Sequence, residues 1–269
     1  MNLLPGIQSR MTWNERSGVY CGKGVKTAYK EQAGNVAEIN LVLTAMLRKA
    51  DIKAHPVLVS TRANGIALFP SRTAFNYVVC AVESDNGHIL LDATSKHSSP
   101  NLLPVRALNG MGRLLRPDGT SVEVDLTPQS NSREAINMIA NIDATGKITG
   151  QVRDAYSDYF AFHFRERYGN VSKESYIEKL EKQYQGAIID GYEGKNKNDK
   201  TQPFIETYNF THDGVVDVIG DKMYFSPLLI FLRAENPFKQ EKRDYPVDFI
   251  FPKQERYTIN INIPAGLVM

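Results

Sequence analysis

The stretch from Asn35 to Ala50 constrains the fold more than any other part of the chain. Asn35 is a good N-cap for a helix, and Glu38, three residues later, can complete a capping box. Apolar residues then recur at helical spacing in a wide stripe, which comprises Val36, Ile39, Val42, Leu43, Met46 and Leu47. The sequence therefore predicts a helix over residues 36–50 that is buried on most sides.

Three strand candidates follow this helix, at residues 55–61, 74–83 and 88–94. The second and third are joined by a short segment in which Asn86-Gly87 is a strong hairpin signal. A helix packed on an antiparallel sheet is an α+β arrangement. We therefore expect residues 1–110 to form an α+β core.

The remaining chain is mainly β in pattern. Two helices are predicted within it, at residues 157–169 and 172–186. Strand patterns lie on both sides of these helices, at residues 113–126, 134–157, 204–211, 215–225, 245–251 and 256–263. We predict a second domain over residues 111–269, a β-sandwich-like domain with two inserted helices.

Charge and composition exclude several function classes. The 32 basic and 30 acidic residues are scattered along the chain and give a net charge of +2, so we expect no nucleic-acid partner. No run approaches the ~18 apolar residues of a membrane-spanning helix. The 2 cysteines and 5 histidines lack the spacings of metal sites, and we expect neither a metal nor a cofactor.

Three short motifs resemble those of the transglutaminase-like superfamily of papain-type cysteine enzymes. In that family a cysteine begins the core helix, a histidine lies in the next strands, and an aspartate follows them. The matching stretches here are Gly34-Asn35-Val36, Phe75-Asn76-Tyr77 and Leu91-Asp92-Ala93-Thr94. The resemblance therefore places Val36 at the position of the cysteine, Tyr77 at that of the histidine, and Asp92 at that of the aspartate.

The resemblance extends roughly over residues 34–269. Residues 101–115, 236–249 and 263–266 are similar to a β-rich domain of unknown function that follows transglutaminase-like cores in envelope proteins of some Gram-negative bacteria. This similarity implies a periplasmic or secreted protein. Such proteins also carry an N-terminal β-domain and an export signal, neither of which is recognisable here, so we expect the core to be incomplete at its N-terminus.

The residues at the three positions predict a protein without catalysis. Cysteine enzymes need a thiolate, an imidazole and a group that orients the imidazole. Val36 supplies no nucleophile, and Tyr77, with an ordinary pKa near ~10, cannot replace an imidazole, although it can donate a hydrogen bond to Asp92. We expect a binding or scaffolding component of the bacterial envelope that holds a peptide or glycan in the residual cleft. The candidate cleft residues are Asn35, Asn76, Cys21 and His97.

Two alternatives remain open at this point. Cys21 precedes the core helix and can serve as a displaced thiol, which would make the protein an active cysteine peptidase or acyltransferase that retains Asp92. Cys80 is expected to be a small core residue, and a bridge between Cys21 and Cys80 is not excluded. In the second alternative, the C-terminal domain binds carbohydrate and the core supports it.

Overall fold

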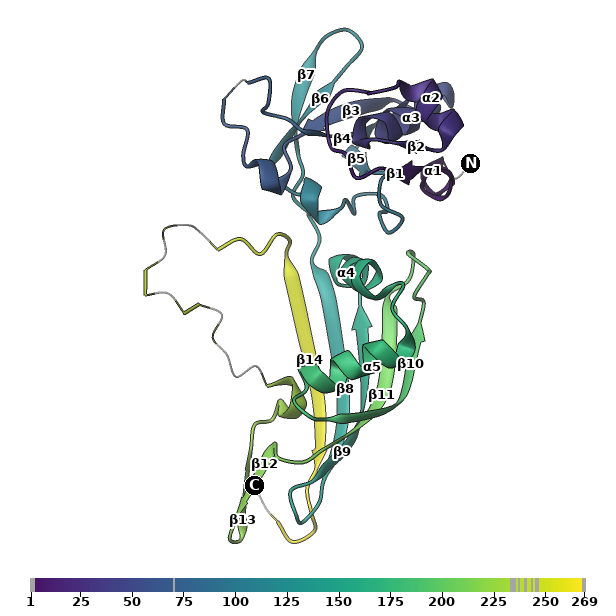
Figure 1. Ribbon diagram of the computed structural model, residues 1–269. Helices are drawn as coiled ribbons and strands as arrows, with labels where there is room; N and C mark the ends of the chain where they lie inside the picture. Colours follow the sequence, from purple (N-terminus) through teal and green to yellow (C-terminus); the bar gives the residue numbers. More distant parts are fainter. Residues whose placement is uncertain are drawn as a thin grey trace. The chain divides into compact units, whose positions relative to one another are not determined.

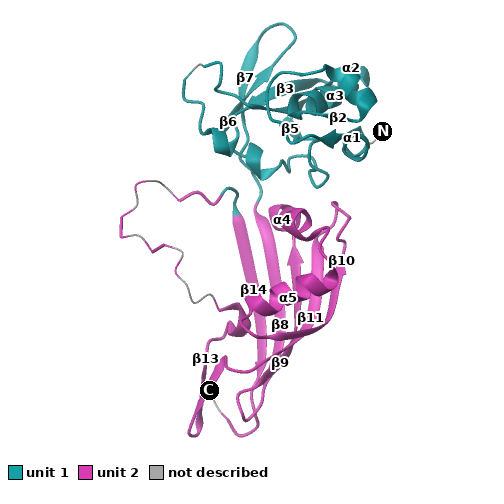
Figure 2. Ribbon diagram, in the orientation of Figure 1, with its two compact units in different colours: residues 1–130, 250–252 teal, residues 131–249, 253–269 magenta. Residues whose placement is uncertain are grey.

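The computed structural model describes residues 3–69, 71–232, 236, 238–239, 241–242, 244 and 247–267. The chain forms two compact units (Figure 2), which are residues 1–130 with 250–252 (unit 1) and residues 131–249 with 253–269 (unit 2). We predicted a boundary after residue 110, whereas the chain divides after residue 130. The reason is that the hairpin of β6 (Met111–Leu115) and β7 (Ser121–Asp125) extends the sheet of unit 1.

Unit 1 is a helix layer on an antiparallel sheet, as the sequence predicts (Figure 1). Its strand order is β5-β4-β3-β6-β7, and every pair is antiparallel. The apolar stripe of α3 packs on the sheet together with two shorter helices, which explains why this helix is buried on most sides. The elements not yet bounded are α1 (Leu3–Arg10), β1 (Thr12–Trp13), α2 (Val25–Glu31), β2 (Ala33–Gly34), α3 (Val36–Lys49), β3 (Ala54–Val59), η1 (Arg62–Asn64), β4 (Tyr77–Ser84), β5 (Gly87–Leu91) and η2 (Val105–Ala107).

Unit 2 has a five-stranded sheet of order β10-β11-β9-β8-β14, in which β14 is parallel to β8. Helices α4 and α5 cover one face of this sheet (Figure 1), and buried residues alternate with exposed ones along its long strands. The other face, called the open face below, carries mainly exposed or partly exposed side chains in the described part of the chain. The bounds are β8 (Ser132–Ile142), β9 (Ile148–Tyr156), α4 (Asp158–Tyr168), α5 (Lys173–Gln183), β10 (Ile188–Lys195), β11 (Phe204–His212), β12 (Val216–Ile219), β13 (Lys222–Phe225), η3 (Leu229–Phe231) and β14 (Lys253–Asn262).

The α+β class is thus confirmed, but the second unit differs from the sandwich that we predicted. Its core lies between one sheet and two helices rather than between two sheets. The predicted strand at residues 215–225 is a separate hairpin of β12 and β13. Of the predicted strand at 245–251, residues 245 and 246 lie outside the described residues and 247–251 are not in a strand. Among the helices that the structure describes, none has the length and apolar character needed to cross a membrane.

Candidate functional site

Val36, the first of the three motif positions, begins helix α3 and is fully buried. The predicted capping box is present: Asn35 Oδ1 accepts from the Glu38 backbone N–H at 2.9 Å, and Glu38 Oε2 accepts from the Asn35 backbone N–H at 2.9 Å. The N–H of Val36 itself donates to the carbonyl of Arg16 at 3.2 Å. The backbone N–H groups of Val36 and Glu38, at the positive end of the α3 dipole, therefore already have acceptors within the protein. The side chain of Val36 carries no reactive group.

The other two positions, Tyr77 and Asp92, are in direct contact. Tyr77 begins β4, Asp92 directly follows β5, and both side chains are fully buried. The Tyr77 hydroxyl donates to Asp92 Oδ2 at 2.7 Å, as the sequence suggested. Burial, and next the nearby carboxylate, raise the pKa of Tyr77 well above its ordinary value. The hydroxyl is consequently a permanent donor to Asp92 near neutral pH.

The second oxygen of Asp92 is also occupied. Oδ1 accepts from the backbone N–H of Thr94 at 2.7 Å, from the Thr94 hydroxyl at 2.7 Å, and from Asn40 Nδ2 at 3.1 Å. Asn40 reaches this oxygen from the buried side of α3. Together with Tyr77 these groups place four donors on the carboxylate, three of them at Oδ1 and one at Oδ2. Both oxygens of Asp92 are therefore engaged by donors of the protein itself.

Arg106, in η2, completes the network from the far side of the two hydroxyls. Its Nε donates to the Tyr77 hydroxyl at 3.0 Å, and its Nη2 donates to the Thr94 hydroxyl at 2.7 Å. Each hydroxyl in turn donates to one oxygen of Asp92. The guanidinium charge is thus connected to the buried carboxylate by two parallel hydrogen-bonded paths, which offsets part of the cost of burying Asp92.

Trp13 connects this network to the start of helix α3. The Arg106 guanidinium carbon lies 4.3 Å from the centroid of the Trp13 ring, in a cation–π contact. Trp13 Nε1 donates at 3.0 Å to the carbonyl of Arg16, the same carbonyl that accepts from Val36. A chain of contacts through Trp13 and Arg106 therefore links the start of α3, where Val36 lies, to Tyr77 and Asp92.

Sequence reasoning missed Asn40, Thr94, Trp13 and Arg106. Asn40 carried a signal, because it is a polar residue in the middle of the most apolar helix of the chain. Trp13 is the single tryptophan of the chain, but no pattern in the sequence around it indicates a partner. No motif or residue spacing around Arg106 indicates that it belongs to this network.

Of the four candidate cleft residues, Asn76 holds a loop through its side chain, and His97 lies in a turn. Asn76 Oδ1 accepts from the Thr61 backbone N–H at 2.8 Å, and its Nδ2 donates to the Thr61 hydroxyl at 2.9 Å. It therefore fixes the two ends of the loop between β3 and β4. His97 is half-buried, and its backbone N–H donates to Ser95 Oγ at 3.2 Å in the turn after β5.

Both cysteines are free thiols, so the bridge that the sequence left open is not formed. Burial raises the pKa of Cys21, and the negative charge of Glu38 raises it further. Cys80 lies in the core against α3, as predicted, and burial raises its pKa to about 11. Near neutral pH both groups are therefore thiols rather than the thiolates that act as nucleophiles.

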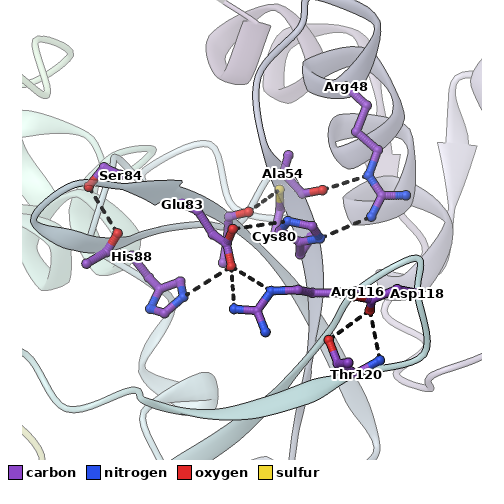
Figure 3. Close-up of polar contacts among 12 residues, drawn as sticks. Arg48, Ala54, Cys80, Glu83, Ser84, His88, Arg116, Asp118 and Thr120 are labelled. Atoms are coloured by element: carbon purple, nitrogen blue, oxygen red, sulfur yellow. Dashed lines mark hydrogen bonds and ion pairs between the residues drawn. The ribbon is translucent and has the colours of Figure 1, made fainter.

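A second polar cluster, which the sequence did not indicate, surrounds Glu83 on β4 (Figure 3). Glu83 Oε1 accepts from Arg116 Nε at 2.9 Å and from Arg116 Nη2 at 2.6 Å. His55 Nε2 lies 3.6 Å from Oε2, and His88 Nε2 lies 4.0 Å from Oε1. Because Arg116 belongs to the turn after β6, this cluster fastens the β6–β7 hairpin to the sheet of unit 1. In the described part of the chain, no group of three or more acidic, histidine and cysteine side chains is arranged to hold a metal ion.

The comparisons with known proteins concern both the C-terminal region and the whole chain. The family model of a domain of unknown function with a solved structure, DUF3858, matches residues 221–269. A crystal structure described as that of a "putative protease" from Parabacteroides distasonis is similar at 11% identity and a TM-score of 0.38, over 85% of this chain. The chain spans 46% of the length of that protein. No curated protein matches the chain. The predicted resemblance of the C-terminal region to a domain of unknown function is therefore confirmed over residues 221–269.

Proposed function

We propose that this protein is a transglutaminase-like protein without catalysis, which acts as a binding or scaffolding component. The engagement of both Asp92 oxygens carries the proposal, because Tyr77, Thr94 and Asn40 place four donors at 2.7–3.1 Å from them. A papain-type enzyme needs that carboxylate for its imidazole and a thiolate at the helix start, where Val36 lies. The resemblance of the C-terminal region to domains of envelope proteins supports a periplasmic or secreted location.

A displaced thiol at Cys21 is the weaker hypothesis. Nucleophilic cysteines lie beside positive groups or an imidazole, which stabilise the thiolate. The charged neighbour that acts on Cys21 is the carboxylate of Glu38, which has the opposite effect and raises the pKa of the thiol. Glu38 is fixed in place by its capping-box hydrogen bond to Asn35. The surroundings of Cys21 therefore oppose the reaction that this hypothesis requires.

An exposed apolar loop supports a binding role. Ile66, Leu68 and Phe69 lie between β3 and β4, and their exposed fractions are 70%, 74% and 79%. Asn76 joins the two ends of the loop through Thr61, and Asn109 Nδ2 holds its middle by donating to the carbonyl of residue 65 at 2.8 Å. Apolar groups that are exposed together commonly mark a protein-binding surface. Of the two ligand classes considered for unit 1, this surface favours an extended peptide over a glycan.

The absence of catalysis is tested with fluorogenic peptide amides and with an amine acceptor for acyl transfer. We expect no turnover above buffer for the wild type or for Cys21→Ala, while a papain-type enzyme reacts in the same assay. Turnover that disappears in Cys21→Ala would establish the displaced-thiol enzyme. Turnover that persists in Cys21→Ala with Cys80→Ala would refute both hypotheses, since no thiol would remain.

The peptide-binding role is tested by selection from a random peptide library, followed by fluorescence anisotropy with the selected peptides. We expect Leu68→Ser and Phe69→Ser to weaken binding at least ~10-fold, which corresponds to about 1.4 kcal/mol. Ile188→Ser is the matched control, because Ile188 is 63% exposed but lies on β10 of unit 2. Equal loss in all three variants would contradict a specific role for the loop.

Glycan binding by unit 2 is a second candidate, favoured by the open face of its sheet. Gln151 Nε2 donates to Asn209 Oδ1 at 3.2 Å, and Asn209 Nδ2 donates to Asp190 Oδ1 at 2.8 Å. This row of polar groups crosses three strands beside a cavity of about 510 Å³. Amides and carboxylates are suitable partners for sugar hydroxyls. A glycan array with the full chain tests this candidate, with Asn209→Ala expected to lose signal and Asn137→Ala, an exposed residue of β8 outside the cavity lining, expected to keep it.

A further inference from the structure

A cavity of about 490 Å³ lies at the edge strand β10 of unit 2, and residues of α4, α5 and β11 also line it. Its volume falls within the roughly 300–1,000 Å³ of small-molecule sites, which are mostly apolar and carry a few well-placed polar groups. The peptide and glycan surfaces proposed above do not include this cavity. Five aromatic residues line it, namely Phe164, Tyr168, Tyr176, Tyr192 and Phe204.

These aromatic rings pack against one another and form a wall. Phe164 stacks on Phe204 with ring centroids 3.6 Å apart, and it meets Tyr176 edge-to-face at 5.3 Å. Tyr176 also contacts Tyr168 at 4.9 Å and Tyr192 at 5.4 Å between centroids. Phe204 is fully buried, whereas Phe164, Tyr176 and Tyr192 are each 7–8% exposed and Tyr168 is half-buried. A flat apolar group of a ligand can therefore lie against rings that are already in place.

Gly194 of β10 leaves room beside this wall. It lies directly opposite the buried Glu206 in the ladder, so the side chain that it lacks would point to the helix-covered face. A Cβ at this position would lie 3.3 Å from the Phe204 ring and 3.4 Å from the Tyr192 hydroxyl. Gly194 is exposed and lines the cavity, so the cavity takes the place of a side chain here. Glu206 is not part of the lining, and its Oε2 accepts from the Tyr192 hydroxyl at 3.0 Å.

Lys197 brings a positive charge to one end of the cavity. Its Nζ donates to the carbonyl of Val171 at 3.4 Å, and both residues line the cavity. Val171 belongs to the connection between α4 and α5, and Lys173, the exposed first residue of α5, brings a second positive charge to the same wall. An ammonium group has three N–H donors, and the bond to Val171 uses one of those of Lys197. Lys197 therefore has donors for an acceptor on a ligand.

The other two charged residues of the lining belong to β10 and point elsewhere. Glu193 and Lys195 are opposite Thr207 and Ile205, which alternate along β11 with its buried residues. Because side chains alternate between the two faces of a strand, Glu193 and Lys195 point to the face opposite to that of Gly194. The charges on the cavity side are therefore those of the two lysines at the α4–α5 connection.

Arg165 of α4 holds the loop that carries Lys197. It is only 4% exposed, and its guanidinium donates at 2.7–3.1 Å to the carbonyls of four loop residues, Asn196, Lys197, Asp199 and Gln202. Removing acceptors from a buried charge is costly, so this arrangement resists change. The backbone of Lys197 is thus fixed before a ligand binds, which reduces the ordering cost of binding.

We propose that this cavity binds a small aromatic carboxylate, whose ring lies against the tyrosine wall and whose carboxylate accepts from Lys197 Nζ. An ion-paired hydrogen bond of this kind is stronger than a neutral one. A cationic ligand would meet the two lysines, and a neutral one would gain only the contact with the rings. The site belongs to the helix-covered side of unit 2, so it does not depend on the peptide role of unit 1 or on glycan binding at the open face.

Isothermal titration calorimetry on the full chain at pH 7 tests the proposal with three probes of one shape. They are 3-phenylpropionate, the neutral 3-phenylpropionamide and the cationic 3-phenylpropylammonium. We expect the carboxylate to bind, and the amide and the ammonium to bind at least ~10-fold more weakly. Equal or tighter binding of either of these two, or no binding of the carboxylate at concentrations up to tens of millimolar, would overturn the proposal.

Lys197→Met tests the contact with the carboxylate, because it keeps an unbranched side chain and removes the ammonium. We expect it to weaken binding of 3-phenylpropionate at least ~10-fold and to leave the affinity for the amide unchanged, whereas Lys197→Arg should retain most of the selectivity. Lys182→Met is the control, since Lys182 is an exposed lysine of α5 outside the cavity lining, and it should bind as the wild type does. Undiminished binding of the carboxylate by folded Lys197→Met would overturn the proposal.

Gly194→Ala tests the position of the ring. Its methyl group takes up room in the cavity, so we expect the carboxylate and the amide to lose affinity together, each at least ~3-fold. Near-UV circular dichroism confirms that each variant is folded. Unchanged affinity in folded Gly194→Ala would show that the ligand binds elsewhere and would refute the site. If Lys197→Met does not fold, the selectivity of the wild type and the loss in Gly194→Ala decide the proposal.

Discussion

Asp92 of unit 1 and Asp154 of unit 2 are both aspartates with almost no exposed surface, but their surroundings are opposite. Asp92 receives four hydrogen bonds and is connected through two hydroxyls to Arg106. Asp154 faces a second buried carboxyl group, and one of its oxygens has no partner in the described part of the chain. The comparison teaches that burial alone does not mark a functional carboxylate. The aspartate with donors at both oxygens is a structural anchor, whereas the burial of the aspartate that lacks a donor at one oxygen is not offset by a hydrogen bond there.

The largest effect is expected when the carboxylate of Asp92 is removed. Asp92→Ala takes away the acceptor that Tyr77, Asn40 and Thr94 share, and it leaves Arg106 without its counter-charge. Breaking a buried charged network by removing one partner costs about 3–5 kcal/mol of the free energy of unfolding. Urea unfolding followed by the fluorescence of Trp13, the single tryptophan of the chain, measures this loss in unit 1.

Asp118→Ala is the control for this measurement. Asp118 is an exposed aspartate of unit 1 that accepts from the Thr120 backbone N–H at 2.9 Å in a turn. We expect it to change the unfolding midpoint little, because water replaces the lost hydrogen bond. If the Asp92 variant were no less stable than this control, the network around Asp92 would not be the anchor that its geometry indicates.

For Asp154, we expect instead a contribution to stability that depends on pH. The pKa of Asp154 is raised to about 8, above its ordinary value near 4, so the folded state binds more protons than the unfolded state between these values. The free energy of unfolding should therefore fall as pH rises from 5 to 9. Because Glu206 also takes up protons in the folded state, we expect Asp154→Asn to remove only part of this fall, about 2–3 kcal/mol.

Urea unfolding at pH 5 and pH 9, followed by the near-UV circular dichroism of the tyrosines, measures that pH dependence. The wild type should lose stability across the interval, and Asp154→Asn should lose less. Asp190→Asn should follow the wild type, since it changes an exposed carboxylate of the same sheet. Parallel curves for the wild type and Asp154→Asn would show that Asp154 is charged throughout, which removes the contrast with Asp92.

A smaller effect is expected when Arg106, the cation linked to Asp92 through two hydroxyls, is replaced. Arg106→Lys keeps the charge, but an ammonium cannot present the two separate nitrogens that bind the hydroxyls of Tyr77 and Thr94, and it stacks less well on Trp13. We expect a loss of about 1–2 kcal/mol and a shifted emission maximum of Trp13 in the folded state. Arg113→Lys, in an exposed ion pair with Glu123, should change neither quantity. An unshifted emission maximum in Arg106→Lys would contradict the stacking on Trp13.

Local features of unit 1 were predictable because their causes lie within a few residues. The capping box, the length of α3 and the hairpin at Asn86-Gly87 all follow from neighbouring side chains, and each is confirmed. The bond between Tyr77 and Asp92 was foreseen from the resemblance. Trp13 and Arg106 were not, because they meet only after the chain has folded and no short-range pattern joins them.

In unit 2 the same limit applies to the sheet. The strictly alternating C-terminal segment was predicted as a strand. Its pairing with β8 could not be predicted, because it places Lys253 opposite Ser132, and residues so far apart in the sequence share no local pattern. The burial of Asp154 did have a local signal. Side chains alternate between the two faces of a strand, so Asp154 lies on the same face of β9 as the buried Ile148 and Val152. A charged residue on the apolar face of a predicted strand therefore indicates a buried charge. The register of the sheet is still needed to identify Glu206 as its neighbour.

The smallest effect on stability is expected when the N-cap residues of α3 and α5 are replaced. Asn35→Ala removes the side-chain acceptor of a capping box and also the bond from Asn35 Nδ2 to the carbonyl of Tyr20, at 2.9 Å. We expect a loss of about 1 kcal/mol, seen as a lower midpoint of the Trp13 transition. Ser172 caps α5 with one bond, from the Ser175 backbone N–H at 3.2 Å, so Ser172→Ala should cost about half as much in the tyrosine signal of unit 2. Equal losses would mean that the additional bond from Asn35 Nδ2 to the carbonyl of Tyr20 adds nothing to the cap of α3.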